Sequence, residues 1–174
     1  MTIVSEPCSA PVSLPQVNVR RASPADAPAV TAAYNEGIED RVATFRTNAQ
    51  TPEAFAERIE AGVVGVAEDE AGEIIGTAWS STYDAAPHYA GVREVAVYVR
   101  REARRRGVGR ALISWLADEA SDAGAYKLVA KVFTTNTGSL SLFRACGWRE
   151  VGVHERHGRL DGEWKDVTVL ERSL

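Results

Sequence analysis

The sequence predicts a single domain of mixed α/β class, in which helices pack on a sheet that contains both parallel and antiparallel strands. Three observations lead to this class. The chain of 174 residues has a length that favours one hydrophobic core. Helical and strand periodicities of apolar residues are interspersed along it. Three predicted strands follow one another directly, which favours a mixed sheet over a fully parallel one.

The first predicted elements are a strand and two helices. Residues 1–16 lack the basic start and apolar core of a secretory signal, so we expect a flexible tail before one domain at residues 17–174. Residues 17–20 alternate as a half-buried strand does. Each helix opens with a hydroxyl residue before proline and stops at a glycine, one from Ser23 to Gly37 and the other from Thr51 to Gly62.

The second half of the chain supplies the rest of the sheet. Residues 63–67 and 74–79 read as a hairpin, followed by a strand at 94–99. A helix then begins near Val108 and stops near Gly124. The remaining elements are a strand at 127–132, a short helix at 139–145 and strands at 148–155 and 166–171. The predicted order is β-α-α-β-β-β-α-β-α-β-β, without internal repeats.

Composition excludes several classes of protein. The net charge of −4 gives no overall positive field for nucleic acid. The apolar stretches are shorter than the roughly 20 residues that a membrane span needs. Cys8 and Cys146 have neither metal-ligand nor disulfide spacing, and His154 and His157 have no metal-ligand partner at usable spacing. We therefore expect no metal and a reducing, cytoplasmic location.

One loop stands out against this acidic background. After the strand at 94–99, the helix opens within Arg104-x-x-Gly107-x-Gly109. The free N–H groups of a helix start can hold a diphosphate, which glycines let approach and arginines bind with charge-assisted hydrogen bonds. A tight turn and a solvated or nucleic-acid-binding face are the alternatives. The arginines concerned are Arg100, Arg101, Arg104, Arg105, Arg106 and Arg110.

This loop resembles the signature of the GNAT N-acetyltransferases, in which a strand, Arg/Gln-x-x-Gly-x-Gly/Ala and a long helix follow one another. A second family signature is similar to residues 136–148, and the element order is similar along residues 17–172. The resemblance implies direct transfer from acetyl-CoA, whose pantetheine arm pairs with the strand edge at 97–99. The cofactor-binding residues that it implies are Val97, Tyr98, Val99, Arg104, Arg105, Arg106, Gly107, Val108, Gly109, Arg110, Asn136 and Ser139. Asn136 also suits a helix N-cap, and both roles can coexist.

Within the family, residues 34–52, 93–99 and 158–166 resemble the phosphinothricin and arsinothricin N-acetyltransferases. These enzymes acetylate the α-amine of glutamate-like toxins or of methionine sulfoximine and confer antibiotic resistance. The resemblance also implies a homodimer. This chain departs from the pattern in two places. Relatives often carry arginine where residues 85–89 read Ala-Ala-Pro-His-Tyr, and phosphinothricin enzymes have histidine where this chain has Asp161.

Several residues are candidates for roles at the acceptor site, and the resemblance supports one of them, Glu94. Glu94 matches the catalytic glutamate that removes the proton of the acceptor ammonium, although a solvent-facing strand-end glutamate is the alternative. The N–H near Val97 polarises the thioester carbonyl, and Tyr98 is either the acid for the leaving thiolate or a packing residue. The acceptor-binding candidates are Phe45, Arg46, Tyr89 and Arg93, with His88 and Lys165 as further possible cations.

Three other functions stay open. The acceptor can be a different amine, such as an aminoglycoside, a polyamine or a protein N-terminus. The domain can also be a non-catalytic module that binds coenzyme A. Nucleic-acid binding by the arginine run is disfavoured by the acidic net charge and by the absence of interleaved aromatic residues.

Overall fold

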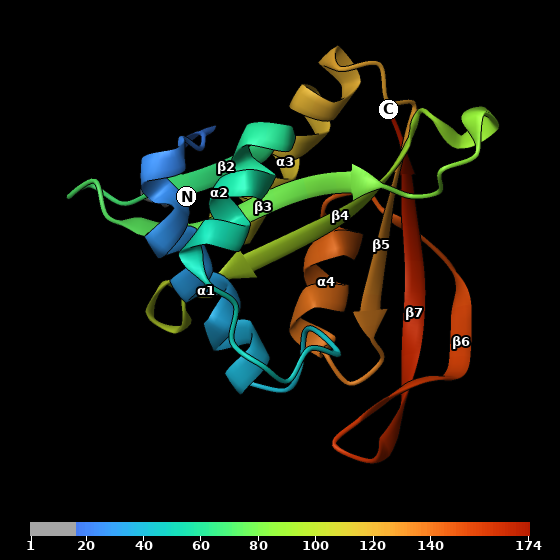
Figure 1. Ribbon diagram of the computed structural model, residues 1–174. Coiled ribbons are helices and arrows are strands. Elements are labelled where there is room, and N and C mark those ends of the chain that lie inside the picture. Colours follow the sequence, from blue (N-terminus) through green and yellow to red (C-terminus); the bar gives the residue numbers. More distant parts are fainter. Residues whose placement is uncertain (1–16) are drawn as a thin grey trace, which may run out of the picture.

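A computed structural model describes residues 17–174 and shows helices on both faces of one seven-stranded sheet (Figure 1). The strand order is β1-β2-β3-β4-β5-β7-β6. The strands are β1 (Asn18–Arg21), β2 (Val64–Glu68), β3 (Ile74–Thr82), β4 (Val92–Val99), β5 (Lys127–Phe133), β6 (Arg149–Leu160) and β7 (Glu163–Ser173). The helices are α1 (Ala27–Glu39), α2 (Pro52–Ala61), α3 (Val108–Asp122) and α4 (Thr137–Ala145), with short 3-10 turns at Pro24–Asp26, Pro87–Tyr89 and Arg101–Ala103.

The predicted order of helices and strands and the mixed sheet are confirmed. The predicted tail at residues 1–16, which includes Cys8, lies outside the described residues. Gly37 was expected to end the first helix, and this is wrong, because α1 continues through it to Glu39. A Cβ at Gly37 would meet Cδ1 of Tyr98 at 2.7 Å, so this glycine lets α1 lie close to β4. The left-handed φ of 58° at Arg41 follows the helix end instead.

The two outer faces of the sheet carry separate hydrophobic clusters. Side chains of α3 and α4 pack on one face, where Leu112 and Leu116 are fully buried. Burial of each leucine contributes about 1.5–3 kcal/mol. On the other face α1 and α2 enclose an aromatic group in which Tyr34 contacts Phe55, Trp79 and Tyr98. These layers fix β4 in the middle of the molecule.

β4 and β5 are the only parallel pair of neighbouring strands in the described sheet. They pair only from Val92 to Glu94 on β4 and from Lys127 to Val129 on β5. Beyond these residues the two strands separate, as Figure 1 shows. The sheet is therefore open between the carboxyl ends of β4 and β5.

The final hairpin is longer than the sequence suggested. The paired strands β6 and β7 turn at Asp161 and Gly162, both with positive φ. None of the helices in residues 17–174 is long and apolar enough to cross a membrane. The same residues contain no cluster of three or more side chains suited to a metal ion.

Candidate functional site

The gap between β4 and β5 exposes backbone groups of both strands. The N–H of Arg100 donates to the carbonyl of Ile75 on β3 at 2.9 Å, and Arg100 directly follows β4. Because N–H and C=O direction alternates along a strand, Val97 and Val99 point these groups away from β3, into the gap. The Val99 carbonyl accepts a hydrogen bond from Arg104 Nε at 3.1 Å. The N–H and C=O of Val97 therefore face the gap.

β5 forms the opposite wall in the same way. The N–H of Thr134 donates to the Asp166 carbonyl next to β7 at 3.1 Å, so alternation directs the backbone groups of Lys131 toward β4. A cavity of about 580 Å³ occupies the space between the separated strands. It is lined by both strands, by the loop after α1 and by the start of α4.

At the end of β4, the chain turns into α3 through two left-handed residues. Arg105 has a φ of 62°, and Gly107, the N-cap of α3, has a φ of 85°. Glycine adopts this φ without a steric penalty, whereas arginine rarely does. Within the described chain no acceptor bonds the N–H groups of residues 105–110. Successive free N–H groups at a helix start form a site for an anion.

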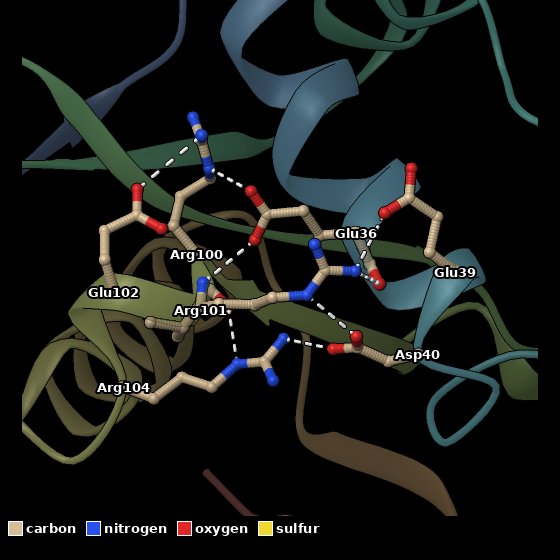
Figure 2. Close-up of polar contacts among 8 residues, drawn as sticks. Glu36, Glu39, Asp40, Arg100, Arg101, Glu102 and Arg104 are labelled. Carbon is tan, nitrogen blue, oxygen red and sulfur yellow. Dashed lines mark hydrogen bonds and ion pairs between the residues drawn. The ribbon is translucent and has the colours of Figure 1, made fainter.

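The arginine run divides into two groups, and one of them is tied to α1 (Figure 2). Arg100 Nε lies 2.6 Å from Glu36 Oε1, and the backbone N–H of Arg101 donates to Oε2 of the same residue at 2.9 Å. Arg101 and Arg104 both bond Asp40, through Nε at 2.8 Å and Nη2 at 2.7 Å. Three arginines therefore hold the loop against the last turn of α1.

Asp40 sits at the centre of this ion-pair cluster. Burial alone would raise the pKa of its carboxyl, but the hydrogen bonds from Arg104 and Arg101 outweigh burial and leave the pKa below its ordinary value. Asp40 thus remains ionised at neutral pH. Asp40 directly follows α1 and leads into the loop that lines the cavity. The ion-pair cluster therefore connects this loop to the loop before α3.

The other arginines of the run are Arg105, Arg106 and Arg110. All three are exposed, and none has an ion pair or hydrogen bond among residues 17–174. They flank the free N–H groups at the start of α3. Arg104 was expected among the phosphate-binding residues, but its guanidinium is engaged by Asp40 and the Val99 carbonyl. The sequence alone could not show which arginines form ion pairs, because their partners Glu36 and Asp40 lie 64 residues before Arg100 and Arg104.

Gly109 has a packing role that the sequence did not reveal. A Cβ at this position would lie 2.7 Å from Cδ2 of Leu142. Its missing side chain therefore lets α3 approach α4 closely. Gly107, by contrast, is needed for its left-handed backbone.

The Glu94 side chain lines the cavity, one-third exposed. Its Oε2 accepts a hydrogen bond from Lys131 Nζ on β5 at 2.8 Å. Lys131 was not among the predicted site residues. Its charge interrupts the apolar run of residues 128–133, and this was the signal in the sequence. Only the parallel pairing of β4 and β5 brings it to Glu94.

Tyr98 lines the cavity from the same face of β4 as Glu94 and is largely enclosed by aromatic rings. Its ring stacks on Trp79 with centroids 5.3 Å apart and meets Tyr34 edge-on at 4.7 Å. Burial, with a smaller effect of Tyr34, raises the pKa of Tyr98 far above that of an exposed tyrosine. The phenol therefore stays protonated at neutral pH.

Asn136 and Ser139 come to the cavity at the start of α4. Asn136 Oδ1 accepts from the Ser139 N–H at 3.1 Å, which caps the helix as one of the predicted roles requires. The amide of Asn136 also donates to the Val42 carbonyl at 3.0 Å. Asn136 therefore fixes the loop after α1 over the cavity.

The acceptor candidates divide in the structure. Phe45 and Arg46 line the cavity, and Phe45 packs edge-on against Phe133 at 4.7 Å. Tyr89 lies in the exposed 3-10 turn before β4, outside the cavity lining. Arg93 precedes Glu94 on β4 and so points to the opposite face, where it bonds Thr82 and the Ser80 carbonyl. The structure does not bring Tyr89 or Arg93 to the cavity.

His157 enters the cavity wall from an irregular stretch of β6, where the pairing with β7 shifts. Arg156 has a left-handed φ of 50°, and its N–H donates to Asp166 Oδ1 at 2.7 Å. Nδ1 of His157 lies 3.2 Å from Nδ1 of His154. Sequence spacing gave His157 no role, because the bulge that turns it inward breaks the regular alternation of the strand.

The chain is similar in sequence and fold to known acetyltransferases. The sequence profile of the acetyltransferase (GNAT) family matches residues 30–148. The phosphinothricin N-acetyltransferase of Streptomyces coelicolor is 34% identical, over 91% of this chain and 97% of its own length. An L-methionine sulfoximine/L-methionine sulfone acetyltransferase of Pseudomonas aeruginosa is 30% identical, over 90% and 94%. A solved phosphinothricin acetyltransferase of Sinorhizobium meliloti in complex with AcCoA superposes with a TM-score of 0.85 at 29% identity, covering 91% of this chain and 88% of that one.

Proposed function

This chain belongs to the GNAT family of acetyltransferases, and we propose that it transfers an acetyl group from acetyl-CoA to the α-amine of a small glutamate-like amino acid. Phosphinothricin, arsinothricin and methionine sulfoximine are the proposed acceptors. One observation carries the proposal: the cavity between the separated strands holds the single carboxylate Glu94 together with the cations Arg46 and Lys131.

The residues present fit acetyl-CoA. The N–H and C=O of Val97 face the gap, where a pantetheine amide can pair with them as a further strand does. The free N–H groups of residues 105–110 suit the diphosphate, with Arg105, Arg106 and Arg110 as its charge partners. Val99 ends the strand before this loop, the backbone of Gly107, Val108 and Gly109 carries part of these N–H groups, and Asn136 and Ser139 line the cavity on the α4 side.

The side chains around the cavity support direct transfer. Acetyl-CoA supplies an acetyl thioester. Glu94 accepts a proton from the acceptor ammonium, directly or through water, which frees the nitrogen lone pair to form the new C–N bond as the C–S bond breaks. The N–H of Val97 polarises the carbonyl oxygen. As the amide forms, the nitrogen loses its second proton, and the Tyr98 hydroxyl at the cavity wall relays it: the hydroxyl donates its own proton to the leaving sulfur and receives the proton from nitrogen, so CoA leaves as the thiol.

The charge of the cavity favours an amino acid over a polycationic amine. Arg46 lines the cavity and pairs with no carboxylate among the described residues. A polyamine or an aminoglycoside carries several ammonium groups and would meet Arg46 and Lys131 with only Glu94 to balance them. An acceptor with an acidic group beside its amine matches these charges.

A panel assay tests the proposal. Release of free CoA is measured with phosphinothricin, arsinothricin, methionine sulfoximine, spermidine, an aminoglycoside and a peptide with a free N-terminus. We expect turnover of one of the three amino acids and a fall in kcat of about 10²–10⁴ in Glu94→Gln. Glu163→Gln, which removes a carboxylate paired with Lys165 on an exposed hairpin, is the matched control and should retain full activity.

Two outcomes would contradict the proposal. Turnover of spermidine, the aminoglycoside or the peptide, with none of the three amino acids, would assign a different acceptor. Binding of acetyl-CoA without turnover of any amine, unchanged by Glu94→Gln, would identify a non-catalytic module instead.

We further propose a cytoplasmic homodimer that confers resistance to such a toxin. The edge strand β6 is exposed along most of its length, with Val151 and Val153 each 51% exposed, and offers a surface for a second copy. Sedimentation velocity should give twice the 18.8 kDa chain mass. Expression in a phosphinothricin-sensitive bacterium should raise the tolerated toxin concentration, and Glu94→Gln should abolish the effect.

A further inference from the structure

Lys131 and Glu94 form an ion pair inside the cavity. They come from adjacent parallel strands, and Nζ lies 2.8 Å from Oε2. The side chains are 37% and 33% exposed, so each is open to a ligand in the cavity that both of them line. The pair is thus part of the site and remains accessible.

Both members of the pair keep bonding capacity for a ligand. Among the described residues, Lys131 is the only hydrogen-bond partner of the Glu94 side chain, and it bonds Oε2 only. An ammonium group has three donors, and Glu94 takes one of them. The Tyr83 ring lies 5.6 Å from Nζ of Lys131 and helps to hold the ammonium in place.

We infer that Lys131 is the residue that selects amino acids over simple amines, by binding the α-carboxylate of the acceptor while Glu94 receives its α-ammonium. This inference rests on the proposed function. An α-amino acid carries its ammonium and carboxylate on one carbon, so the two charges are neighbours of opposite sign. The Glu94–Lys131 pair presents the reverse arrangement and binds both groups at once.

The loop on the Tyr83 side of the pair brings no other cation into the cavity, because His88, its one candidate, lies outside the cavity lining. Residues 83–91 contain neither lysine nor arginine. Arg93 lies on the opposite face of β4, where it bonds Ser80 and Thr82. Arg46 enters from the loop after α1 and is left to bind the distal acidic group of the acceptor.

The test compares Lys131→Met with the matched control Lys127→Met. Lys127 lies on the same strand and pairs with Glu171 at 3.2 Å, outside the cavity lining. Each variant is assayed with L-methionine sulfoximine and with its methyl ester, which keeps the amine and loses the carboxylate charge. Calorimetric titration of the CoA-bound enzyme with L-methionine sulfoximine gives a second readout that needs no turnover.

We expect Lys131→Met to lower kcat/KM for the free acid by about 10- to 100-fold, mainly through KM, because one hydrogen bond between charged groups is lost. The ester should change less than about threefold, and binding of the free acid should weaken in parallel. Lys131→Arg should restore most of the discrimination, and Lys127→Met should leave both substrates unaffected.

Equal losses for acid and ester would overturn the inference, because Lys131 would then act only by orienting Glu94. Unchanged kinetics in Lys131→Met would overturn it as well. If the wild-type enzyme acetylates neither this nor any other amino acid, the proposed function fails together with the inference. If the wild type acetylates the free acid and Lys131→Met has no effect, the inference is refuted and the proposed function stands.

Discussion

Replacing Asp40 with asparagine tests whether the ion pairs between α1 and the loop before α3 hold the cofactor site in place. The substitution keeps the shape of the side chain and removes the charge that Arg101 and Arg104 share. Asp40 is 19% exposed, whereas the two arginines are 46% and 44% exposed. Solvent therefore screens each pair strongly, and each contributes about 0.5–1 kcal/mol rather than the value of a buried pair.

Loss of both pairs should destabilise the protein by about 1–2 kcal/mol. In a domain of this size that corresponds to a fall in melting temperature of about 3–6 °C. Thermal unfolding followed by circular dichroism measures it, with Glu163→Gln as the control for an exposed pair, which should leave the melting temperature unchanged. A melting temperature within about 1 °C of wild type would refute this role of the cluster.

The same variant also decides what Arg104 does. We expect a higher Kd for acetyl-CoA, because the loop with the free N–H groups is less firmly held. If Arg104 instead bound a phosphate of the cofactor, Asp40 would compete with that phosphate for the guanidinium, and the variant would bind acetyl-CoA more tightly. Tighter binding would therefore contradict the division of the arginine run.

Three further predictions concern stability and the pH dependence of activity. The hydrogen bond from Arg20 lowers the pKa of Asp26 from 3.8 to about 2, so this pair stabilises the fold above pH 4 and the contribution is lost as the pH falls toward 2. Asp26→Asn should lower the free energy of unfolding by about 1–2 kcal/mol at pH 7 and by almost nothing near pH 2. Urea unfolding at both pH values measures this difference, and an equal loss at both would contradict the prediction. Gly109→Ala should cost about 1–3 kcal/mol, because its Cβ would meet Leu142 at 2.7 Å, and a differential scanning calorimetry trace that matches wild type would refute this. Because burial raises the pKa of Tyr98, the plot of kcat against pH should show no tyrosine limb near pH 10, and a limb that disappears in Tyr98→Phe would contradict the assignment.

Local signals predicted the elements well where proline and glycine mark their ends. Pro52 opens α2, and Gly62 is its C-cap, as expected from the sequence. Gly37 misled the prediction because its purpose is contact with Tyr98, which is distant in the chain. Periodicity cannot distinguish a glycine that ends a helix from one that makes room for a neighbour.

The candidate site was less accessible to sequence reasoning. Glu94 and the loop before α3 are marked by local patterns, but the pairing of the arginines depends on where α1 ends in space. Lys131 joins Glu94 only through the pairing of two parallel strands, and His157 turns inward only through a bulge. In each case the decisive contact joins segments that no local pattern connects.

We expect the N–H groups at the start of α3 and the three arginines free of carboxylates to bind the diphosphate of coenzyme A together. Calorimetric titration of the wild type and of the triple variant R105Q/R106Q/R110Q, with CoA and with pantetheine, measures this binding. We predict that wild type binds CoA at least about a hundredfold more tightly than pantetheine, and that added salt and the triple variant each remove much of this advantage. Equal affinity for CoA and pantetheine, or a triple variant that binds CoA as wild type does, would contradict the claim.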